Sequence, residues 1–413
     1  MEIVRIVIYA SIYLGLVATS FFILSYISDR KKKKLLFSDE ELPRVSIIIP
    51  AYNEEKSIAG TIKTILASDY PKEKFELLVV DDGSKDKTLE ISKRFEKQGV
   101  RVFSKKNAGK GSALNFGIKK AKGEIIFSSD ADTIADSVSV KNMVRYFKDK
   151  DVASVTPAMV IAKPKGLWQR IQHIEYLSGL FLRKAFAAVN AIHITPGCFS
   201  AYRKSFFDKY GGYEEGNITE DLELSLRIQY NGYIIENSLE SPVYTIPPKD
   251  FKGLLIQRRR WYYGLLKNSW KYRKIFSPKY GDLGVFVFPV AWLGIFFSLF
   301  VLIYFIFKNL FRLKEELMFL SSINFDFGNL FNLNFYLLER LFILLVSNPI
   351  VIFLSFFIIV LGCYLLFATR RVSKVSSVFI NLPLFFIFFA TLFGIWWLIT
   401  IFYSIFNKEI KWR

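Results

Sequence analysis

The chain has 413 residues, of which 52% are hydrophobic, with a mean hydropathy of +0.27 and a formal net charge of +19. This hydropathy argues against an ordinary soluble protein, yet the charged fraction of 23% lies near the soluble average of about 25%. Both values hold only if the apolar residues are segregated, so the composition predicts a soluble domain joined to membrane spans. The two cysteines, Cys198 and Cys363, form no spaced pair, and two histidines do not predict a zinc site.

Four apolar segments are long enough to cross a bilayer, which needs about 20 residues. They run from Val4 to Ile27, from Val285 to Phe307, from Leu341 to Phe367 and from Val378 to Phe406. The first segment ends at Arg30 and the run Lys31 to Lys34, which is unlike the small-residue cleavage site of a signal peptide. We therefore interpret it as an uncleaved anchor.

Basic residues next to the spans predict the orientation, because they favour the cytoplasmic side. The basic run after the first span and the cluster of Arg370, Arg371 and Lys374 are both cytoplasmic if the N-terminus is outside. The sequence thus predicts a multi-pass plasma-membrane protein in which residues from about 30 to 280 are cytoplasmic. With four spans, however, the terminal basic residues 408, 411 and 413 lie outside, against the same rule.

The segment after the first span alternates short β-rich runs with helical stretches. Strands are predicted at Val45–Ala51, Leu77–Val80, Val100–Phe103, Glu124–Ser128 and Val152–Pro157, and helices at Ser57–Ala67, Lys87–Lys97 and Gly111–Lys120. Strands about 20–30 residues apart with intervening helices indicate an α/β domain with a mostly parallel sheet.

Ligands of an open α/β sheet bind beyond the carboxyl ends of its strands, so the residues at these positions are the most informative. Polar clusters occur there three times: Tyr52, Asn53 and Glu54 after the first strand, Asp81 and Asp82 after the second, and Asp130 and Asp132 after the fourth. Each cluster alone is also typical of a turn or a helix cap. Together, the acids repel one another unless a cation lies between them. Oxygen ligands without histidine or thiolate favour Mg²⁺ or Mn²⁺ that bridges a diphosphate.

A basic, glycine-containing loop from Lys105 to Gly111 leads into the third predicted helix. Its backbone N–H groups and Lys110 are suited to phosphate oxygens. The loop lacks the spacing of a P-loop, so nucleoside triphosphate hydrolysis is not indicated. A solvated basic loop explains the same residues, and both interpretations stay open.

Two later segments have helical spacing and aromatic faces. The stretch Phe251–Trp270 places apolar and aromatic residues on one face and basic residues elsewhere, which is typical of an amphipathic helix in a membrane interface. Trp168–Phe186 has a weaker pattern that fits either an interfacial or a core helix. Within it, His173 is expected on the helix surface, whereas His193 is expected to be structural.

Five short motifs occur in order along the chain: Pro50–Glu54, Asp81–Ser84, Asp130–Asp132, Thr219–Asp221 and Gln257–Trp261. This series resembles glycosyltransferase family 2, in particular its processive membrane synthases of cellulose, chitin, hyaluronan and poly-N-acetylglucosamine. The resemblance covers residues from about 42 to 275. It implies a glycosyltransferase-A-type, Rossmann-like domain, joined here to about four transmembrane helices and to interfacial amphipathic helices.

The resemblance also implies an organisation into four parts. Residues 1–41 form the anchor and its basic flank, 42–245 the nucleotide-sugar domain, 246–280 the interfacial segment, and 281–413 a transmembrane region of about three spans. The interfacial segment carries the Gln257–Trp261 motif, so the motif is expected where the cytosolic site meets the membrane.

The resemblance assigns the donor and the metal to the strand ends and to the interfacial motif. The donor is expected at Tyr52, Asn53, Glu54, Asp81, Asp82, Lys110, Asp130, Gln257 and Arg260, and the metal, Mg²⁺ or Mn²⁺, at Asp130 and Asp132. In this family the second motif holds the uracil and ribose of a UDP-sugar, and the third positions the metal on the diphosphate. Positive charge near the departing diphosphate is what the chemistry requires.

On the same resemblance, Asp221 is the base that deprotonates the acceptor hydroxyl, a role that requires hydrogen-bond reach of that hydroxyl. Gly197, Cys198, Glu220 and Trp261 are expected to contact the acceptor, the tryptophan by offering an apolar face to a sugar ring. Without the resemblance, residues 219–221 are equally typical of a helix start, and segment 195–198 of a tight turn. Nothing adjacent in the sequence would activate Cys198 as a nucleophile.

Three functions account for parts of this pattern. The first is an inverting, metal-dependent synthase that uses a UDP-sugar, with UDP-N-acetylglucosamine expected before UDP-glucose. It would extend a β-linked polysaccharide and pass it through its own spans. The second is a non-processive transferase that adds one sugar to a polyprenyl phosphate or another lipid. The third, a transporter or nucleic-acid-binding membrane protein, explains the basic charge but not the ordered carboxylates. The sequence does not indicate nucleic acid as a partner, and it does not identify partner subunits.

Overall fold

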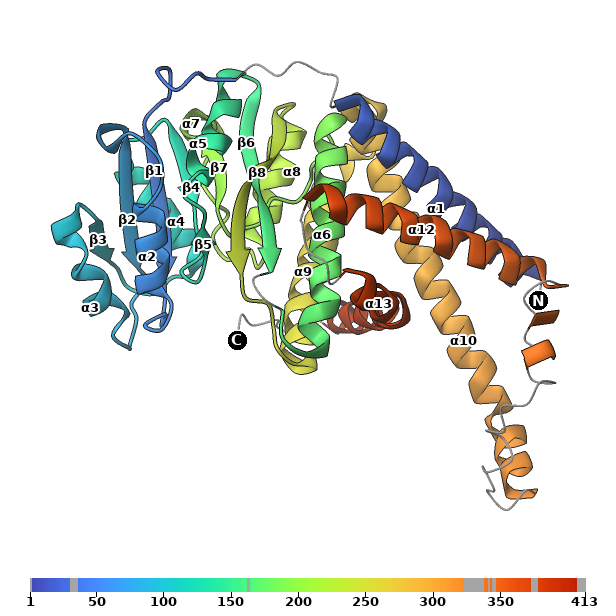
Figure 1. Ribbon diagram of the computed structural model, residues 1–413. Helices are drawn as coiled ribbons and strands as arrows, with labels where there is room; N and C mark the ends of the chain where they lie inside the picture. The colour runs from blue at the N-terminus through green and yellow to red at the C-terminus, as the bar shows by residue number, and fades with distance from the viewer. Residues whose placement is uncertain are drawn as a thin grey trace.

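The computed structural model describes residues 2–29, 36–161, 164–322, 338–340, 342–343, 347–372 and 378–406. The predicted basic run from 30 to 34, Lys374 and the terminal basic residues lie outside the described residues. The described part forms a soluble α/β unit and a group of long helices that extends from one side of it (Figure 1).

The soluble unit is built on one eight-stranded sheet with the order β3-β2-β1-β4-β7-β6-β8-β5. Its strands are β1 Val45–Ala51, β2 Phe75–Asp81, β3 Arg101–Ser104, β4 Ile125–Ser128, β5 Ile134–Ala135, β6 Val152–Ile161, β7 Ser200–Arg203 and β8 Ile234–Thr245. The strands β3, β2, β1 and β4 run parallel to one another, whereas β7 is antiparallel to both of its neighbours. The first four strands therefore end at the same edge, and their following loops meet there.

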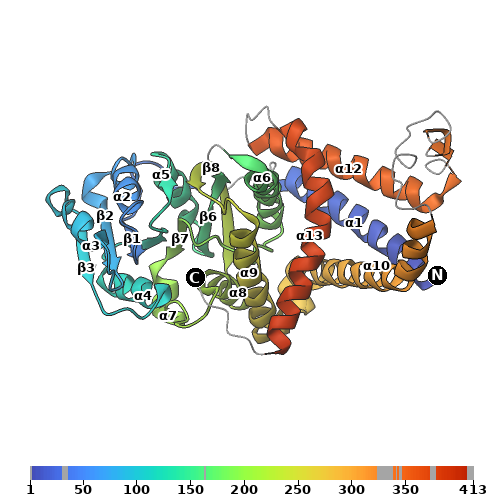
Figure 2. The ribbon, with the colours of Figure 1, turned by 90° about the horizontal axis from the view of Figure 1, so that it is seen from below.

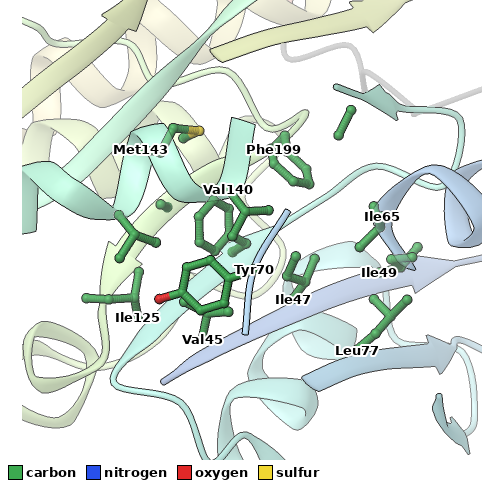
Figure 3. Close-up of a cluster of buried hydrophobic side chains, with 14 of the residues drawn as sticks. Val45, Ile47, Ile49, Ile65, Tyr70, Leu77, Ile125, Val140, Met143 and Phe199 are labelled. Carbon is green, nitrogen blue, oxygen red and sulfur yellow. The ribbon is translucent and has the colours of Figure 1, made fainter. Parts of the chain in front are cut away.

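Both faces of the sheet are covered, which is why β1 is buried along its whole length. Ile47 and Ile49 point into one apolar cluster and Ile48 into the other, as the alternation of side chains along a strand requires. Figure 3 shows Ile47 and Ile49 in the first cluster together with Tyr70 and Val140. Burial of one such isoleucine contributes roughly 1.5–3 kcal/mol, so this strand is a rigid base for the loop that follows it.

Helices pack on the two faces of the sheet. They are α2 Ile58–Leu66, α3 Thr88–Lys93, α4 Lys110–Lys120, α5 Ser139–Val144, α6 Gly166–Ala188, α7 Lys204–Tyr210 and α8 Glu220–Tyr230. Short 3-10 turns lie at Lys72–Lys74, Glu96–Gln98 and Arg145–Lys148. On the second face, Gly117 of α4 lies so close to β1 that an added Cβ would be 2.5 Å from Ile48 Cγ2. Such contacts hold the first turn of α4, which contains Lys110, next to the strand ends.

All five predicted strands and all three predicted helices exist within a few residues of their expected positions. Strands β5, β7 and β8 were not predicted. β5 has two residues, and β7 has four and lies among segments rich in aromatic residues, so neither shows a clear period-two pattern. β8 contains Pro242 and several polar residues and pairs with β6 through an irregular register, so its sequence also lacks a clear period-two pattern.

Three helices in the described part of the chain are long and apolar enough to cross a membrane, at Ile3–Ser28, Leu283–Leu310 and Pro349–Phe367. They belong to α1 Glu2–Asp29, to the π-helical turn Leu283–Val287 with α10 Phe288–Ser322, and to α12 Pro349–Val372. α1 packs against both α10 and α12, and Gly15 allows a close approach of α1 to Phe357. These segments account for three of the four predicted spans.

The fourth predicted span forms α13 Val378–Ile405, but it takes a different direction. Figure 1 shows α13 nearly end-on, and Figure 2 shows it running across α1, α10 and α12. It packs against α6, α10 and α9 Phe251–Lys271, where Tyr262 of α9 stacks on Trp397 with ring centroids 4.7 Å apart. α13 therefore lies between the soluble unit and the spans.

The predicted amphipathic helices are both present as α6 and α9. α6 packs on β6 and β8 on one side and on α1, α12 and α13 on the other. His173 is consequently buried, 2% exposed, and the prediction that it lies on the helix surface was wrong. Its environment lowers the pKa of the imidazole because burial disfavours the charged ring. His193 is also buried and packs against Phe288, as a structural residue would.

Candidate active site

The loop after β1 is fixed by the loop after β2. Asn53, which has a positive φ of 55°, accepts a hydrogen bond from Lys85 N at 2.8 Å, and its own N–H donates to Ser84 Oγ at 3.0 Å. The backbone N–H of Glu54 donates to Thr88 Oγ1 at 2.7 Å. Beside them, Tyr52 is 42% exposed, so its ring is available to a ligand at the end of β1.

Asp81 and Asp82 lie at the end of β2, and both are buried. Asp81 accepts from Ser104 Oγ at 3.1 Å. Asp82 accepts from Lys105 Nζ at 2.7 Å and from the N–H of Gly109 at 2.7 Å. The second motif thus shapes the basic loop that precedes α4, an arrangement that the sequence had not indicated.

The next strand end provides Asp130 and Asp132. Desolvation raises the pKa of Asp132 to about 6 although its side chain still reaches solvent, and the negative charges of Asp130 and Glu54 raise it as well. Two strand ends thus bring three carboxylates close enough to influence one another. Such a concentration of negative charge favours a bound cation.

Lys110 lies at the centre of the predicted catalytic residues. Its Nζ is 2.6 Å from Asp130 Oδ1 and 3.3 Å from Glu220 Oε1. Burial alone would lower the pKa of Lys110, but the charges of Asp130, Glu220 and Asp221 raise it above its usual value. The lysine is therefore a fixed positive charge among three carboxylates that come from two places in the fold, the loop after β4 and the start of α8.

Gly197 packs directly against this cluster. A Cβ at this position would be 2.8 Å from Lys110 Nζ and 3.1 Å from Asp221 Oδ2, so only glycine leaves both groups their room. Asp221 and Glu220 are the first residues of α8, and the backbone oxygen of Asp221 accepts from Thr195 Oγ1 at 3.2 Å. The interpretation of residues 219–221 as a helix start and the assignment of a base to Asp221 are thus compatible.

Cys198, predicted at the acceptor, is buried beside the cluster with its Sγ 2.8 Å from Met159 Sδ. Burial raises the pKa of its thiol, and the charge of Asp130 adds to this effect. A thiol with a raised pKa is a poor nucleophile, in agreement with the sequence.

Helix α9 brings the fifth motif to the start of α8. Gly264 packs so closely on Thr219 that an added Cβ would lie 2.1 Å from its Oγ1, and Asn268 donates to the same oxygen at 3.0 Å. Gln257, Arg260 and Trp261 precede Gly264 by seven, four and three residues. They lie on the same stripe of the helix, because residues at these intervals share a face. The Oε1 atom of Gln257 is buried without a hydrogen-bond partner, which leaves it available to a ligand.

Two features of the site were not predicted from the sequence. Arg258 forms a bidentate pair with Glu175 of α6 at 2.6 and 2.7 Å, and its guanidinium lies over Trp261 and over Trp396 of α13. The pair ties the motif helix to both α6 and α13. The signal in the sequence was Glu175, the single acid in the helical stretch Gly166–Ala188.

The second missed feature is Arg183 of α6, whose charge acts on the thiol of Cys198. Its Nη1 atom is buried without a hydrogen-bond partner, and desolvation lowers the pKa of the guanidinium. An arginine between apolar residues of an amphipathic segment was the only sign of it in the sequence. It adds a second cation on the Gly197–Cys198 side of the cluster.

The donor set fits a divalent cation that is shared with a substrate. Within the part of the chain that the structure describes, no group of three or more His, Cys, Asp or Glu side chains is placed to enclose a metal. Mg²⁺ and Mn²⁺ sites of nucleotide enzymes commonly use one or two carboxylates and complete their shell with phosphate oxygens and water. Asp130 and Asp132 provide such a pair, and the raised pKa of Asp132 reflects negative charge that a cation would offset.

Comparison with known proteins agrees with this geometry. Residues 46–211 match the model of the family described as glycosyl transferase family 2. The poly-beta-1,6-N-acetyl-D-glucosamine synthase of Staphylococcus aureus (strain COL) is 30% identical over 261 residues, 62% of this chain and 63% of the relative. The protein of the same name from Staphylococcus epidermidis is 29% identical over 256 residues, 59% of this chain and 62% of the relative. The match therefore spans less than two thirds of the length of these relatives.

Among solved structures, the mannosyltransferase PcManGT from Pyrobaculum calidifontis, in complex with GDP-Man and Mn2+, has the same fold. It superposes with a TM-score of 0.55 at 21% sequence identity, over 88% of this chain and 98% of that chain. Its fold is the glycosyltransferase-A type that the sequence predicted. Residues 46–211 are therefore similar to glycosyl transferase family 2, and helices long and apolar enough to cross a membrane flank them on both sides.

Proposed function

We propose that this protein is a membrane-bound, inverting glycosyltransferase that uses a UDP-sugar, UDP-N-acetylglucosamine in the first place, to extend a β-linked polysaccharide. One observation carries the proposal: Lys110, Asp130, Glu220 and Asp221 converge around Gly197 at the strand ends. The family and the names of the bacterial relatives support the choice of chemistry and of sugar.

In the proposed reaction, Asp221 takes the proton of an acceptor hydroxyl while the oxygen of that hydroxyl attacks the anomeric carbon of the donor sugar. The attack comes from the face opposite the diphosphate, whose bond to this carbon breaks as UDP leaves. Asp221 suits this role because it lies in the first turn of α8, where its Oδ1 accepts a hydrogen bond from the adjacent N–H of Leu222 at 2.8 Å. Fixing a base in this way is the contribution of positioning to catalysis.

The departing diphosphate needs positive charge, which Lys110 supplies from the cluster and Arg260 from the face of α9. Asp130 and Asp132 would hold Mg²⁺ or Mn²⁺, which offsets diphosphate charge when it is bound. Asp81 and Asp82 hold the segment from Ser104 to Gly109 in place beside the proposed nucleotide site. The exposed ring of Tyr52 offers a face to the uracil of the nucleotide. Trp261 is proposed to contact the acceptor sugar next to the catalytic base, Asp221.

The test is the product made by purified full-length protein from radiolabelled UDP-N-acetylglucosamine and Mn²⁺ or Mg²⁺, in parallel with UDP-glucose. The expected product is a ladder of long chains that a polymer-specific glycosidase digests. A single-sugar product that extracts into organic solvent with added polyprenyl phosphate would instead establish the lipid-directed transferase. Asp221→Asn is the control in each arm, because it removes the base and leaves the remaining fold in place.

A further inference from the structure

A cavity of about 530 Å³ lies away from the carboxylate cluster, where the second half of α9 meets α10 and α13. Its walls are largely aromatic and aliphatic, with Tyr263 and Leu266 from α9 and Trp292 from α10. The volume is in the range of sites that hold small organic ligands, about 300–1,000 Å³. No residue of the proposed catalytic machinery lines it.

The charged groups of the cavity favour an anion. Lys267 and Arg273 line it, both of them exposed, and the described lining contains no acidic side chain. Ser269 is 4% exposed and also lines the cavity, yet its Oγ has no hydrogen-bond partner. A buried hydroxyl is normally paired, so this donor is available to an acceptor oxygen within the cavity.

The position of the cavity indicates what kind of anion reaches it. Trp292 belongs to a helix that is apolar and long enough to span a membrane. Lys267 lies in the last turns of α9, and Arg273 lies in the 3-10 turn Arg273–Ile275 that follows it. An apolar wall from such a helix, together with cations from α9 and the turn after it, matches an amphiphile with an anionic head. Trp270, which is 73% exposed and carries Arg273 over its ring at 5.3 Å, is typical of a residue in the interfacial layer.

We infer that this cavity binds one anionic membrane phospholipid, with its phosphate at Lys267, Arg273 and Ser269 and an acyl chain against Trp292. A lipid bound in the cavity would stabilise the last turns of α9. In the same helix, Gly264 packs against Thr219, two residues before Asp221. The lipid would therefore also stabilise the side of the active site that α8 forms. The site is independent of the sugar that the enzyme transfers.

The experiment counts lipids bound to the full chain by native mass spectrometry in mild detergent, after addition of phosphatidylglycerol or phosphatidylcholine. We expect one phosphatidylglycerol to remain bound at collision energies in the mass spectrometer that remove phosphatidylcholine. The double variant K267Q/R273Q is expected to weaken this binding at least tenfold. The matched control K252Q/K274Q removes two exposed basic residues that do not line the cavity, and it should bind as the wild type does.

A second variant keeps both cations and fills the space. Ser404 of α13 lines the cavity, and S404W should exclude the lipid while an unchanged circular dichroism spectrum and elution volume report a folded protein. Equal retention of the two phospholipids, or unchanged binding in K267Q/R273Q, would mean annular lipid only and would overturn the inference. Preferential retention of a polyprenyl phosphate over phosphatidylglycerol would overturn it as well, in favour of a lipid-linked acceptor. These readouts require no glycosyl transfer, so they stand apart from the test of the proposed function.

Discussion

At the scale of single residues, the charge balance around Lys110 explains how several acids can share one site. Asp130 and Glu220 both lie within 3.3 Å of its Nζ, and the three groups come from β4–β5, α4 and α8. Removal of the lysine would leave a largely buried carboxylate, Glu220, without its nearby cation, which costs several kcal/mol in comparable buried pairs. Lys110 is therefore expected to be a structural requirement of the site, in addition to its proposed role toward the diphosphate.

The raised pKa of Asp132 gives a pH-dependent prediction. Because this pKa is about 6, the carboxyl is increasingly protonated below pH 6, and a proton then competes with the metal. We expect Mn²⁺ to raise the melting temperature of the purified protein clearly at pH 7.5 and much less at pH 5. The Asp132→Asn variant should show little stabilisation at either pH. An equal Mn²⁺ effect at the two pH values in the wild type would contradict the proposed metal ligand.

At the scale of elements, the contact of α9 with α8 decides where the fifth motif lies. Gly264→Ala would place a methyl group 2.1 Å from Thr219 Oγ1, so α9 must move away from the start of α8. Since displacements of about 1 Å can cost 100-fold in rate, we expect a loss of turnover of that order. Gly60→Ala in α2 is the matched control, because a Cβ there meets nothing within 4 Å. Steady-state rates close to wild type in Gly264→Ala would show that this contact does not position the site.

The same elements show what the sequence could predict. Strands β1 and β4 are buried apolar runs followed by acids, and local pattern alone locates them. The role of Asp82 in shaping loop 105–109 and the pairing of Arg258 with Glu175 depend on which segments meet in space. Strands β7 and β8 take their places through tertiary pairing with β6, which short or polar sequences do not reveal. The positions of the site residues were thus largely predictable, whereas their partners were not.

At the scale of the whole molecule, the direction of α13 bears on membrane topology. Composition predicted a fourth span because residues 378–406 are long and apolar, but α13 packs across α6, α9 and α10 (Figure 2). We therefore predict that α13 does not cross the bilayer but packs between the soluble unit and the spans. Three spans would also put the terminal basic residues of the sequence on the cytoplasmic side, in accord with the charge rule.

Reporter fusions test this three-span topology. A green fluorescent protein joined after residue 413 should fluoresce, and an alkaline phosphatase at the same point should be inactive, because both then lie in the cytoplasm. The control is the same pair of reporters joined after residue 340, which should give the opposite result outside the cell. An active phosphatase after residue 413 would restore the arrangement with four spans.

The central claim is that residues at the strand ends and at the start of α8 transfer a sugar, with Asp221 as the base. The most direct measurement compares transfer from radiolabelled UDP-N-acetylglucosamine by the wild type and by Asp221→Asn, with nucleotide binding followed in the same samples. We predict that transfer falls by about 10²–10⁴-fold while UDP affinity changes little, since the base acts on the acceptor and not on the nucleotide. Transfer that persists at the wild-type rate in Asp221→Asn would contradict the account.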